Sequence, residues 1–269
     1  MIRKPAVAGY FYPDNENVLK KTISSFVEKN SIKQEVKGIV VPHAGYMYSG
    51  KVAASVYSQI IIPDDIILIS PNHTGMGARG ALMASGEWKI PGGSFKINSE
   101  LAEMILANTS LLVDDHVAHL KEHSLEVQLP FIHYFRQSTE THIIPITLMY
   151  FDYRSCEEIG KAIARAVKDW GEKILIVAST DMSHYESQRV AEEKDRLAVE
   201  RILAIDPQGL HRTVEKYDIS MCGVISTTVA LVACQELGAK EAELIKYSTS
   251  GDVTGDYRSV VGYAGLIIK

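Results

Sequence analysis

Three histidines occupy equivalent places in the sequence, each shortly after a run of strand-forming residues. His43 follows "GIVVP", His73 follows "IILISPN", and His184 follows "ILIVASTDMS", in a loop that also contains Asp181. Imidazole binds transition metals and exchanges protons near neutral pH. One histidine after a strand indicates little, but three in equivalent places predict a shared site for metal or acid–base chemistry.

The thiol of Cys222, in "DISMCGVISTTVALVACQ", is a fourth group that could serve such a site. If Ser220 caps the apolar helix that follows, Cys222 lies in its first turn, where the helix dipole lowers the pKa of a thiol. A thiolate there would act as a metal ligand or as a nucleophile. Cys156 and Cys234 lack this placement, and we expect them to fill apolar space.

Residues 114–135, "DDHVAHLKEHSLEVQLPFIHYF", hold four further histidines. Helical spacing would align His116, His119 and His123, but the zinc motif HExxH is absent and no cysteine is near. Spacing alone leaves the role of His123 open. We expect structural roles for His116, His133, His142 and His211.

Evenly spaced apolar segments must position these side chains. The expected strands are 38–42, 65–70, 80–85, 142–149, 173–180, 242–248 and 259–269. The segments near residues 40, 67, 145 and 176 are almost wholly apolar. Continuous rather than alternating hydrophobicity is typical of strands that helices cover on both faces.

Segments with helical periodicity lie between these strands. The expected helices are 15–30, 49–60, 98–110, 156–170, 189–205 and 222–238, with Asn98 or Ser99 as the third N-cap and Gly238 after the last helix. The alternation predicts an α/β sandwich: one domain over residues 1–269 with a central, largely parallel mixed sheet flanked by helices. Ligands of open α/β sheets bind beyond the carboxyl ends of the strands, where the three histidines lie.

Composition and charge exclude several classes of protein. The net charge is −5 and no basic stretch is present, so we expect no nucleic-acid partner. No segment approaches the roughly 18 apolar residues of a membrane span, and the start lacks a signal-peptide core. Three cysteines without CxxC spacing fit a reducing cytoplasm. The phosphate-binding glycine motifs are absent, which argues against a nucleotide.

Seven motifs in order, from residue 4 to residue 265, carry a family likeness: "KPAVAGYFYP", "VPHAGYMYSG", "SPNHTG", "EHSLEVQLPF", "STDMSHY", "MCG" and "YSTSGDVTGDYRSVVGYAG". Together they resemble the Memo family (mediator of ErbB2-driven cell motility). Its fold is similar to that of class III extradiol dioxygenases, which hold non-haem Fe(II). The resemblance implies that the metal ligands are His43, His73 and Cys222. It implies an acid–base pair of Asp181 and His184, and it implies that the pocket is lined by Phe11, Tyr48 and His123.

Two departures from these relatives bear on the chemistry. Animal members have tryptophan where this chain has Phe11, which weakens any transfer of their peptide recognition. The dioxygenases supply a carboxylate as the third iron ligand, and here that position is Cys222. A thiolate is a softer donor than a carboxylate, so Cu(I) or Zn(II) joins Fe(II) as a candidate cofactor.

Two other functions stay open on sequence alone. In the first, Cys222 attacks a substrate with a histidine as base and Asp181 as the orienting group, as in a hydrolase. In the second, the protein is no enzyme, and Phe11, Tyr46 and Tyr48 line a pocket for a peptide or small anion. The sequence identifies neither the ligand, which would be a small molecule or a peptide, nor the oligomeric state.

Overall fold

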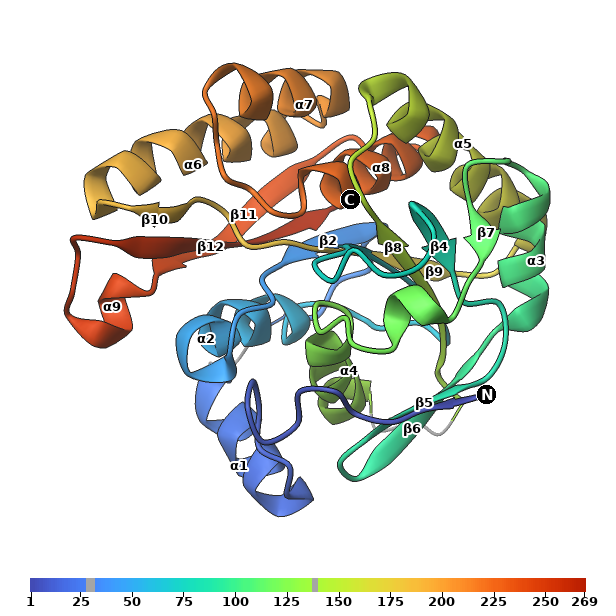
Figure 1. Ribbon diagram of the computed structural model, residues 1–269, viewed down its shortest axis with the longest axis horizontal. Coiled ribbons are helices and arrows are strands. Elements are labelled where there is room, and N and C mark those ends of the chain that lie inside the picture. The colour runs from blue at the N-terminus through green and yellow to red at the C-terminus, as the bar shows by residue number, and fades with distance from the viewer. Residues whose placement is uncertain (28–31, 137–139) are drawn as a thin grey trace.

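The protein is described by a computed structural model that covers residues 1–27, 32–136 and 140–269. A β-sheet runs through its centre, with helices on both faces (Figure 1). Its strands are β1 (Ile2–Arg3), β2 (Gly38–Val41), β3 (Asp65–Pro71), β4 (Gly80–Leu82), β5 (Glu87–Ile90), β6 (Gly93–Ile97), β7 (Val113–Asp114), β8 (His142–Leu148), β9 (Ile174–Ser179), β10 (His184–Glu186), β11 (Ala242–Thr249) and β12 (Val260–Ile268).

The helices alternate with these strands along the chain. They are α1 (Glu16–Phe26), α2 (Tyr46–Tyr57), α3 (Ser99–Ala107), α4 (Leu129–Arg136), α5 (Tyr153–Trp170), α6 (Gln188–Leu203), α7 (Pro207–Lys216), α8 (Val224–Glu236) and α9 (Gly251–Thr254), with the short 3-10 helices η1 (Val117–His119) and η2 (Glu126–Gln128). Among the described residues, no helix has the length and apolar character needed to cross a membrane.

The middle of the sheet is parallel. The strand order is β1-β5-β6-β8-β3-β9-β2-β12-β10, and each neighbouring pair from β6 to β2 is parallel. Strand β12 is antiparallel to β2, and β10 and β11 are antiparallel to β12. The expected α/β fold with a largely parallel mixed sheet is therefore confirmed.

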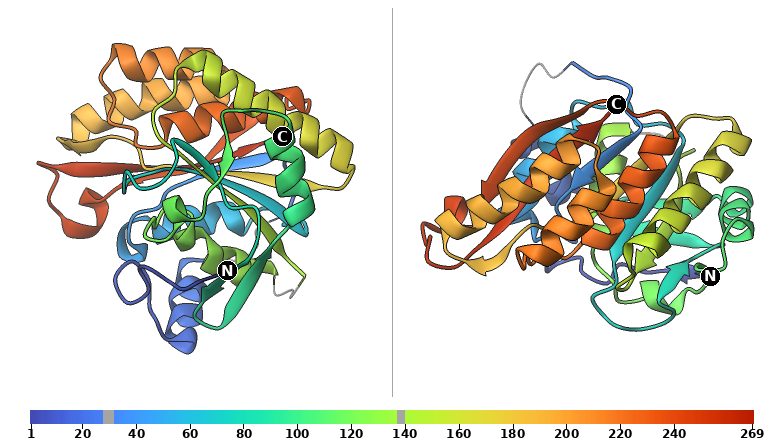
Figure 2. Two further views of the ribbon diagram at one scale, coloured as in Figure 1. Left: turned by 45° about the vertical axis from the view of Figure 1, so that its right-hand side comes forward. Right: turned by 90° about the horizontal axis from the view of Figure 1, so that it is seen from above.

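Both faces of the central strands are buried, as their continuous hydrophobicity predicts. In β2, Ile39 and Val41 face the cluster formed with α1, α2 and α4, whereas Val40 faces the cluster formed with α3 and α5–α8. All three side chains are 0% exposed. Figure 2 shows α5, α6, α7 and α8 side by side over one face of the sheet.

The element ends follow elementary capping rules where the sequence provides them. The side chain of Asn98 accepts a hydrogen bond from the Leu101 N–H and so caps α3. Gly238 has a φ of +83°, as expected for a glycine that ends a helix. The expected helix over 15–30 ends at Phe26, and residues 28–30 of that prediction lie outside the described residues.

The sheet order brings three loops to one edge. Strand β9 lies between β3 and β2, with Ser179 opposite Val41 and Ala178 opposite Ile69. All three strands run in the same direction, so the loops after Val41, Pro71 and Ser179 open at the same end of the sheet. The three histidines singled out in the sequence follow these strands.

Candidate metal centre

The structure brings together the three side chains expected to bind a metal. The ligand atoms of His43, His73 and Cys222 all lie within 4.8 Å of one another. Cys222 Sγ is 3.2 Å from His43 Nε2, and the rings of His43 and His73 have centroids 5.2 Å apart. His43 is 2% exposed, whereas His73 is partly open to solvent. One side of the cluster is therefore accessible.

Cys222 reaches the cluster because the residue after it is glycine. The Gly223 N–H donates to Thr180 Oγ1 at 2.9 Å. A β-carbon on Gly223 would lie 2.4 Å from Thr180 Cβ and 2.6 Å from the Ser179 carbonyl oxygen. Only a residue without a side chain lets this segment approach the end of β9, where it delivers the thiol.

A chain of hydrogen bonds fixes the protonation of the His43 ring. Ser179 Oγ donates its one proton to the Ser124 carbonyl at 2.8 Å and accepts from Gln128 Nε2 at 2.9 Å. It therefore accepts from His43 Nδ1, 3.0 Å away, which must carry the proton. His43 Nε2 is left with a lone pair that faces Cys222 Sγ.

His73 is fixed in the same way by a carboxylate. Its Nδ1 donates to Glu122 Oε1 at 2.9 Å, and its backbone N–H donates to Glu122 Oε2 at 2.6 Å. Burial opposes ionisation of Glu122, but the hydrogen bond from His73 and the nearby imidazoles lower its pKa to about 2. A carboxylate that orients a ligand histidine is a recurrent partner in metal sites.

A second group with metal-ligating side chains shares these residues: His73, Glu122 and His123. Glu122 Oε1 already accepts from His73 Nδ1, from the Ser124 N–H and from the Ser124 hydroxyl. Its lone pairs are therefore engaged. We interpret Glu122 as the group that positions His73, and not as a ligand.

His184 lies at this edge but has a different partner from the one expected. Its backbone N–H donates to Ser220 Oγ at 2.7 Å, and its Nδ1 donates to the Ser220 carbonyl at 2.8 Å. Asp181 makes no hydrogen bond to the His184 ring among the described residues. Ser220, and not Asp181, orients the imidazole and leaves the His184 Nε2 lone pair available.

Asp181 supports the loop that carries His43. Its Oδ1 accepts from the backbone N–H groups of His43 at 2.7 Å and Ala44 at 3.3 Å. Burial raises the pKa of Asp181 to about 6, although these hydrogen bonds oppose the shift. Within the described part of the chain, it is not grouped with the three metal-ligating side chains. Cys222, and not Asp181, is the third donor of that group.

The Cys222 thiol differs from the sequence-based expectation. Helix α8 begins at Val224 with Gly223 as its N-cap, so Cys222 precedes the helix instead of lying in its first turn. Burial, and then the charge of Asp181, raise the pKa of Cys222. The backbone N–H of Asp181 donates to the sulfur at 3.2 Å and opposes this shift only in part. Without a cation, the thiol keeps its proton.

The expected pocket residues divide into two groups. Phe11 packs against His123 with ring centroids 4.6 Å apart, and His123 is 4.8 Å from His73 and 5.4 Å from His43 by the same measure. Tyr46 lies elsewhere: it is 3% exposed, stacks on Phe131 in the core and donates its hydroxyl to the Val127 carbonyl. Tyr46 therefore does not line the site.

Tyr48 is half-buried in the first turn of α2. Burial, and then the charges of Asp181 and Tyr48, raise the pKa of Tyr263. Of the two aromatic side chains implied for the pocket, Phe11 is the one with a ring contact to the cluster, through His123. Burial lowers the pKa of His43 and of His123, so both imidazoles are neutral at neutral pH.

The histidines expected to be structural lie outside the cluster. His211 donates from Nε2 to the Phe151 carbonyl at 3.1 Å, and His142 Nδ1 faces Asp65 at the start of β8. Sequence reasoning missed four partners of the site: Glu122, Ser179, Gln128 and Ser220. Glu122 does precede a histidine in the "EHSLEVQLPF" motif, which is the one signal that could have indicated it.

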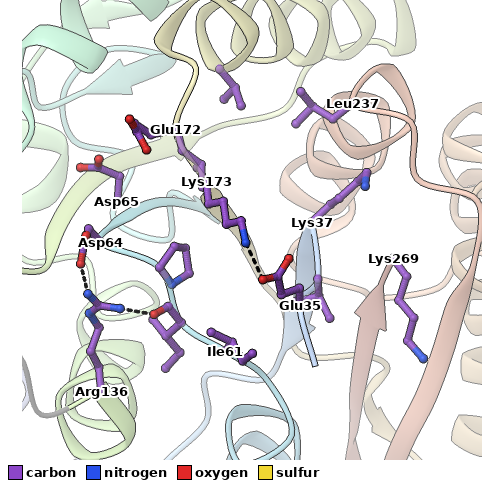
Figure 3. A pocket seen from close by; sticks show the side chains of 15 residues that line it. Glu35, Lys37, Ile61, Asp64, Asp65, Arg136, Glu172, Lys173, Leu237 and Lys269 are labelled. Carbon is purple, nitrogen blue, oxygen red and sulfur yellow. Dashed lines mark hydrogen bonds and ion pairs between the residues drawn. The ribbon is translucent and has the colours of Figure 1, made fainter. Parts of the chain in front are cut away.

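A pocket of about 880 Å³ lies at the opposite end of the sheet, where β2, β3 and β9 begin. Figure 3 shows that oppositely charged side chains pair along its walls: Lys173 with Glu35, and Arg136 with Asp64. None of the residues expected to bind metal or ligand lines it. The cluster at the carboxyl ends therefore remains the candidate site.

Comparisons with known proteins identify the family and the fold. A family model described as "Memo-like protein" matches residues 3–267. A MEMO1 family protein of Methanopyrus kandleri is 40% identical, over 100% of this chain and 99% of its own length. One of Methanothermobacter thermautotrophicus is 41% identical, over 99% and 100%. An uncharacterized protein of Escherichia coli K12 has a similar fold, with a TM-score of 0.56, 11% identity and coverage of 87% of this chain and 100% of that one.

Proposed function

The chain belongs to the Memo-like protein family, and on that premise we propose that it binds one transition-metal ion through His43, His73 and Cys222. The observation that carries the proposal is the convergence of two imidazole nitrogens and a sulfur within 4.8 Å. Hydrogen bonds from Nδ1 leave Nε2 as the ligand atom of both histidines. Three protein ligands leave a further position open for a substrate.

The charges around the cluster suit a cation. Metal ligands must be deprotonated, and burial already keeps His43 neutral. The Cys222 proton leaves when a metal binds, since the positive charge offsets the burial that otherwise favours the thiol. Two imidazoles and a thiolate suit Cu(I) or Zn(II), whereas Fe(II) is the metal that the family likeness implies. A bound metal would supply Lewis-acid or redox chemistry at the open position.

The residues beside the metal would move protons and hold a ligand. Ser220 fixes the His184 ring so that Nε2 can take a proton from a ligand or return one. Asp181, with a pKa of about 6, holds the loop of His43 through its backbone N–H groups. Phe11 and Tyr48 supply apolar surface. We propose redox or oxygen chemistry on a small or peptide ligand as the reaction class.

Metal content tests the proposal directly. Protein purified without oxygen or chelator is compared with His43→Ala, Cys222→Ala and the control Cys156→Ala, whose thiol is buried in the core. We expect about one metal per chain in the native protein and the control, and loss from the other two variants. Titration with Fe(II), Cu(I) and Zn(II) then identifies the preferred metal. A native chain that binds none of the three would contradict the proposal.

The reaction class has its own test. Oxygen uptake by the loaded protein is measured with a catechol-type substrate, for the native chain and for His184→Gln. Uptake that falls in His184→Gln while the metal content stays the same supports proton transfer by His184. Absence of uptake in both, with metal bound, would leave a metal-binding protein without this activity.

The hydrolase alternative fits the site less well. A cysteine nucleophile needs an accessible thiolate, and burial raises the pKa of Cys222 instead. In the alternative of a non-enzymatic binding pocket, Tyr46 cannot line the pocket because it is buried in the core. Phe11 and Tyr48 remain as its aromatic lining. Phe11→Ala and Tyr48→Ala variants that retain metal but lose ligand binding would favour it.

A further inference from the structure

One buried residue, Ser124, lies between the partners of the two histidines of the candidate site. Ser179 and Glu122 engage Nδ1 of His43 and of His73, respectively. The Ser124 carbonyl accepts from Ser179 Oγ at 2.8 Å. The Ser124 N–H and hydroxyl both donate to Glu122 Oε1, at 3.1 and 2.8 Å. A continuous path of hydrogen bonds therefore runs from one imidazole, through Ser124, to the other.

The same network holds the backbone that leads into both histidine loops. Gln128 Nε2 donates to the Pro42 carbonyl and to Ser179 Oγ, each at 2.9 Å. A carbonyl can only accept, so the amide nitrogen of Gln128, and not its oxygen, must face Pro42. The Ser124 hydroxyl has the Pro71 carbonyl as a second and more distant acceptor, at 3.4 Å. Ser124, Ser179 and Gln128 are all 0% exposed, so bulk water does not compete for these hydrogen bonds.

This arrangement differs from an ordinary turn. A hydrogen bond between residues two apart, as from Ser124 to Glu122, is common in loops. The bond from Ser179 is not local, because β9 brings its hydroxyl to Ser124 across 55 residues of sequence. Ser179 Oγ has one proton, and turning it toward His43 would deprive the buried Ser124 carbonyl of this donor, which costs free energy. The partners of the two imidazoles therefore depend on the same residue.

We infer that Ser124 is a positioning residue that couples the two imidazoles, so that a change at the partner of one ring is felt at the other ring. The inference rests on the proposed function, because His43 and His73 are taken to bind the metal. Buried hydrogen-bond networks that are fully satisfied are rigid, and their members reinforce one another. A metal ion would then meet two Nε2 lone pairs in one fixed arrangement, without the cost of ordering each ring separately.

A double-mutant cycle on Zn(II) affinity, measured by competition with a chelating dye, tests the coupling. Ser124→Ala removes the hydroxyl that donates to Glu122, and we expect it to lower the affinity about 10-fold. Ser179→Ala removes the hydroxyl that serves His43. The loss in the double variant should differ from the product of the two single losses by about threefold or more, as for residues that share a network. The control Ser55→Ala, which removes a buried hydroxyl bonded within α2, should bind Zn(II) as the native chain does. Independent losses, or an unchanged affinity in Ser124→Ala, would overturn the inference.

The imidazole nitrogen signals of the metal-free protein, read by NMR, separate positioning from a general loss of stability. The signal that disappears in His43→Ala or in His73→Ala is assigned to that ring. Ser179→Ala should shift the signals of His73, and Ser124→Ala should shift those of His43, whereas Ser55→Ala should shift neither. If Ser179→Ala and Ser124→Ala each shift only the signals of the ring beside the substitution, the inference is wrong.

The two rings lie 5.2 Å apart, so a direct effect between them must be separated from one that passes through Ser124. The shift that Ser179→Ala causes at His73 should shrink when Ser124→Ala is also present, and a shift of equal size there would overturn the inference. If Ser124→Ala does not fold, Ser124→Cys, whose thiol is a weak donor, takes its place in this comparison. A native chain that binds no Zn(II) would count against the proposed function, whereas the ring signals would still decide the coupling.

Discussion

The two ends of the sheet differ in how their polar groups are used. At the amino ends of the strands, a pocket of about 880 Å³ has charges that pair with each other, as in Lys173 with Glu35. At the carboxyl ends, the Nδ1 atoms of His43 and His73 are engaged by Ser179 and Glu122, which leaves the Nε2 lone pair of each ring available to a ligand, and that of His43 faces Cys222 Sγ. The polar groups at the amino ends satisfy one another, whereas those at the carboxyl ends leave lone pairs available to a ligand.

The largest expected loss of stability comes from breaking a buried ion pair near the carboxyl ends of the strands. Arg3 pairs with Glu126, both 1% exposed or less, and donates to the carbonyls of His119 and Glu122. We expect Arg3→Met to lower the free energy of unfolding by about 3–5 kcal/mol, because it leaves a buried carboxylate unpaired. Urea denaturation measures this loss.

The matched variant at the amino end is Arg136→Met, whose partner Asp64 is 63% exposed. We expect it to cost about 1 kcal/mol, because water replaces an exposed partner readily. Equal losses of stability in Arg3→Met and Arg136→Met would mean that burial of the ion pair does not distinguish the two ends of the sheet.

Ser179→Ala tests whether the Ser179 hydroxyl prepares His43 for a metal. Its removal deprives His43 Nδ1 of an acceptor, and we expect metal affinity to fall about 10- to 100-fold. The control is Ser55→Ala, which removes a buried hydroxyl bonded within α2. Competition with a chelating dye measures both affinities. If Ser179→Ala binds metal as the native protein does, the ring of His43 needs no such partner.

We expect acid to lower the stability of the fold through His119, which is buried near the carboxyl ends of the central strands. Burial, and then Arg3, lower the pKa of His119 to about 3, and neither ring nitrogen is hydrogen-bonded. The unfolded chain takes up a proton near pH 6.5 and the folded chain does not, so stability falls as the pH drops below 6.5. The loss of folding stability caused by His119 reaches about 2 kcal/mol at pH 5.

His119→Phe keeps an aromatic ring against Trp88 and removes the proton site. Its free energy of unfolding should therefore fall less than that of the native protein between pH 7 and pH 5. Other buried histidines contribute equally to both proteins, so the difference isolates His119. Parallel pH profiles would contradict the assignment.

Lys173→Met should have the smallest effect. The ion pair of Lys173 with Glu35 is exposed on both sides, and such pairs contribute about 0–1 kcal/mol and weaken with salt. We expect metal affinity to change less than about twofold, because the pair lies at the far end of the sheet. A larger change in metal affinity would reveal coupling between the two ends.

The sequence predicted the central strands well because burial on both faces leaves a plain signal. It missed the β5–β6 hairpin, where Glu87, Lys89 and Lys96 interrupt the apolar residues. It also missed α4 and α7, which are short and begin close to prolines. The capping of α3 by Asn98 needed only local information and could be predicted.

The ligand side chains were recognisable from their place after strands, but their partners were not. Ser179 lies 136 residues from His43, and the register of β2 against β9 brings them together. The direction of the Cys222 pKa shift was also mispredicted. A helix dipole acts within the first turn, whereas Cys222 precedes α8 and burial dominates.

The distance along the chain between the donors has a consequence for biosynthesis. Cys222 is 179 residues after His43, and it reaches the cluster only when the segment before α8 docks against the end of β9. A ribosome that has made both imidazoles still has about 150 residues to translate before the thiol exists. At about 5–20 residues per second, the nascent chain spends several seconds or more with an incomplete set of donors. Under the proposed function, metal capture would therefore be a late event that follows translation of Cys222.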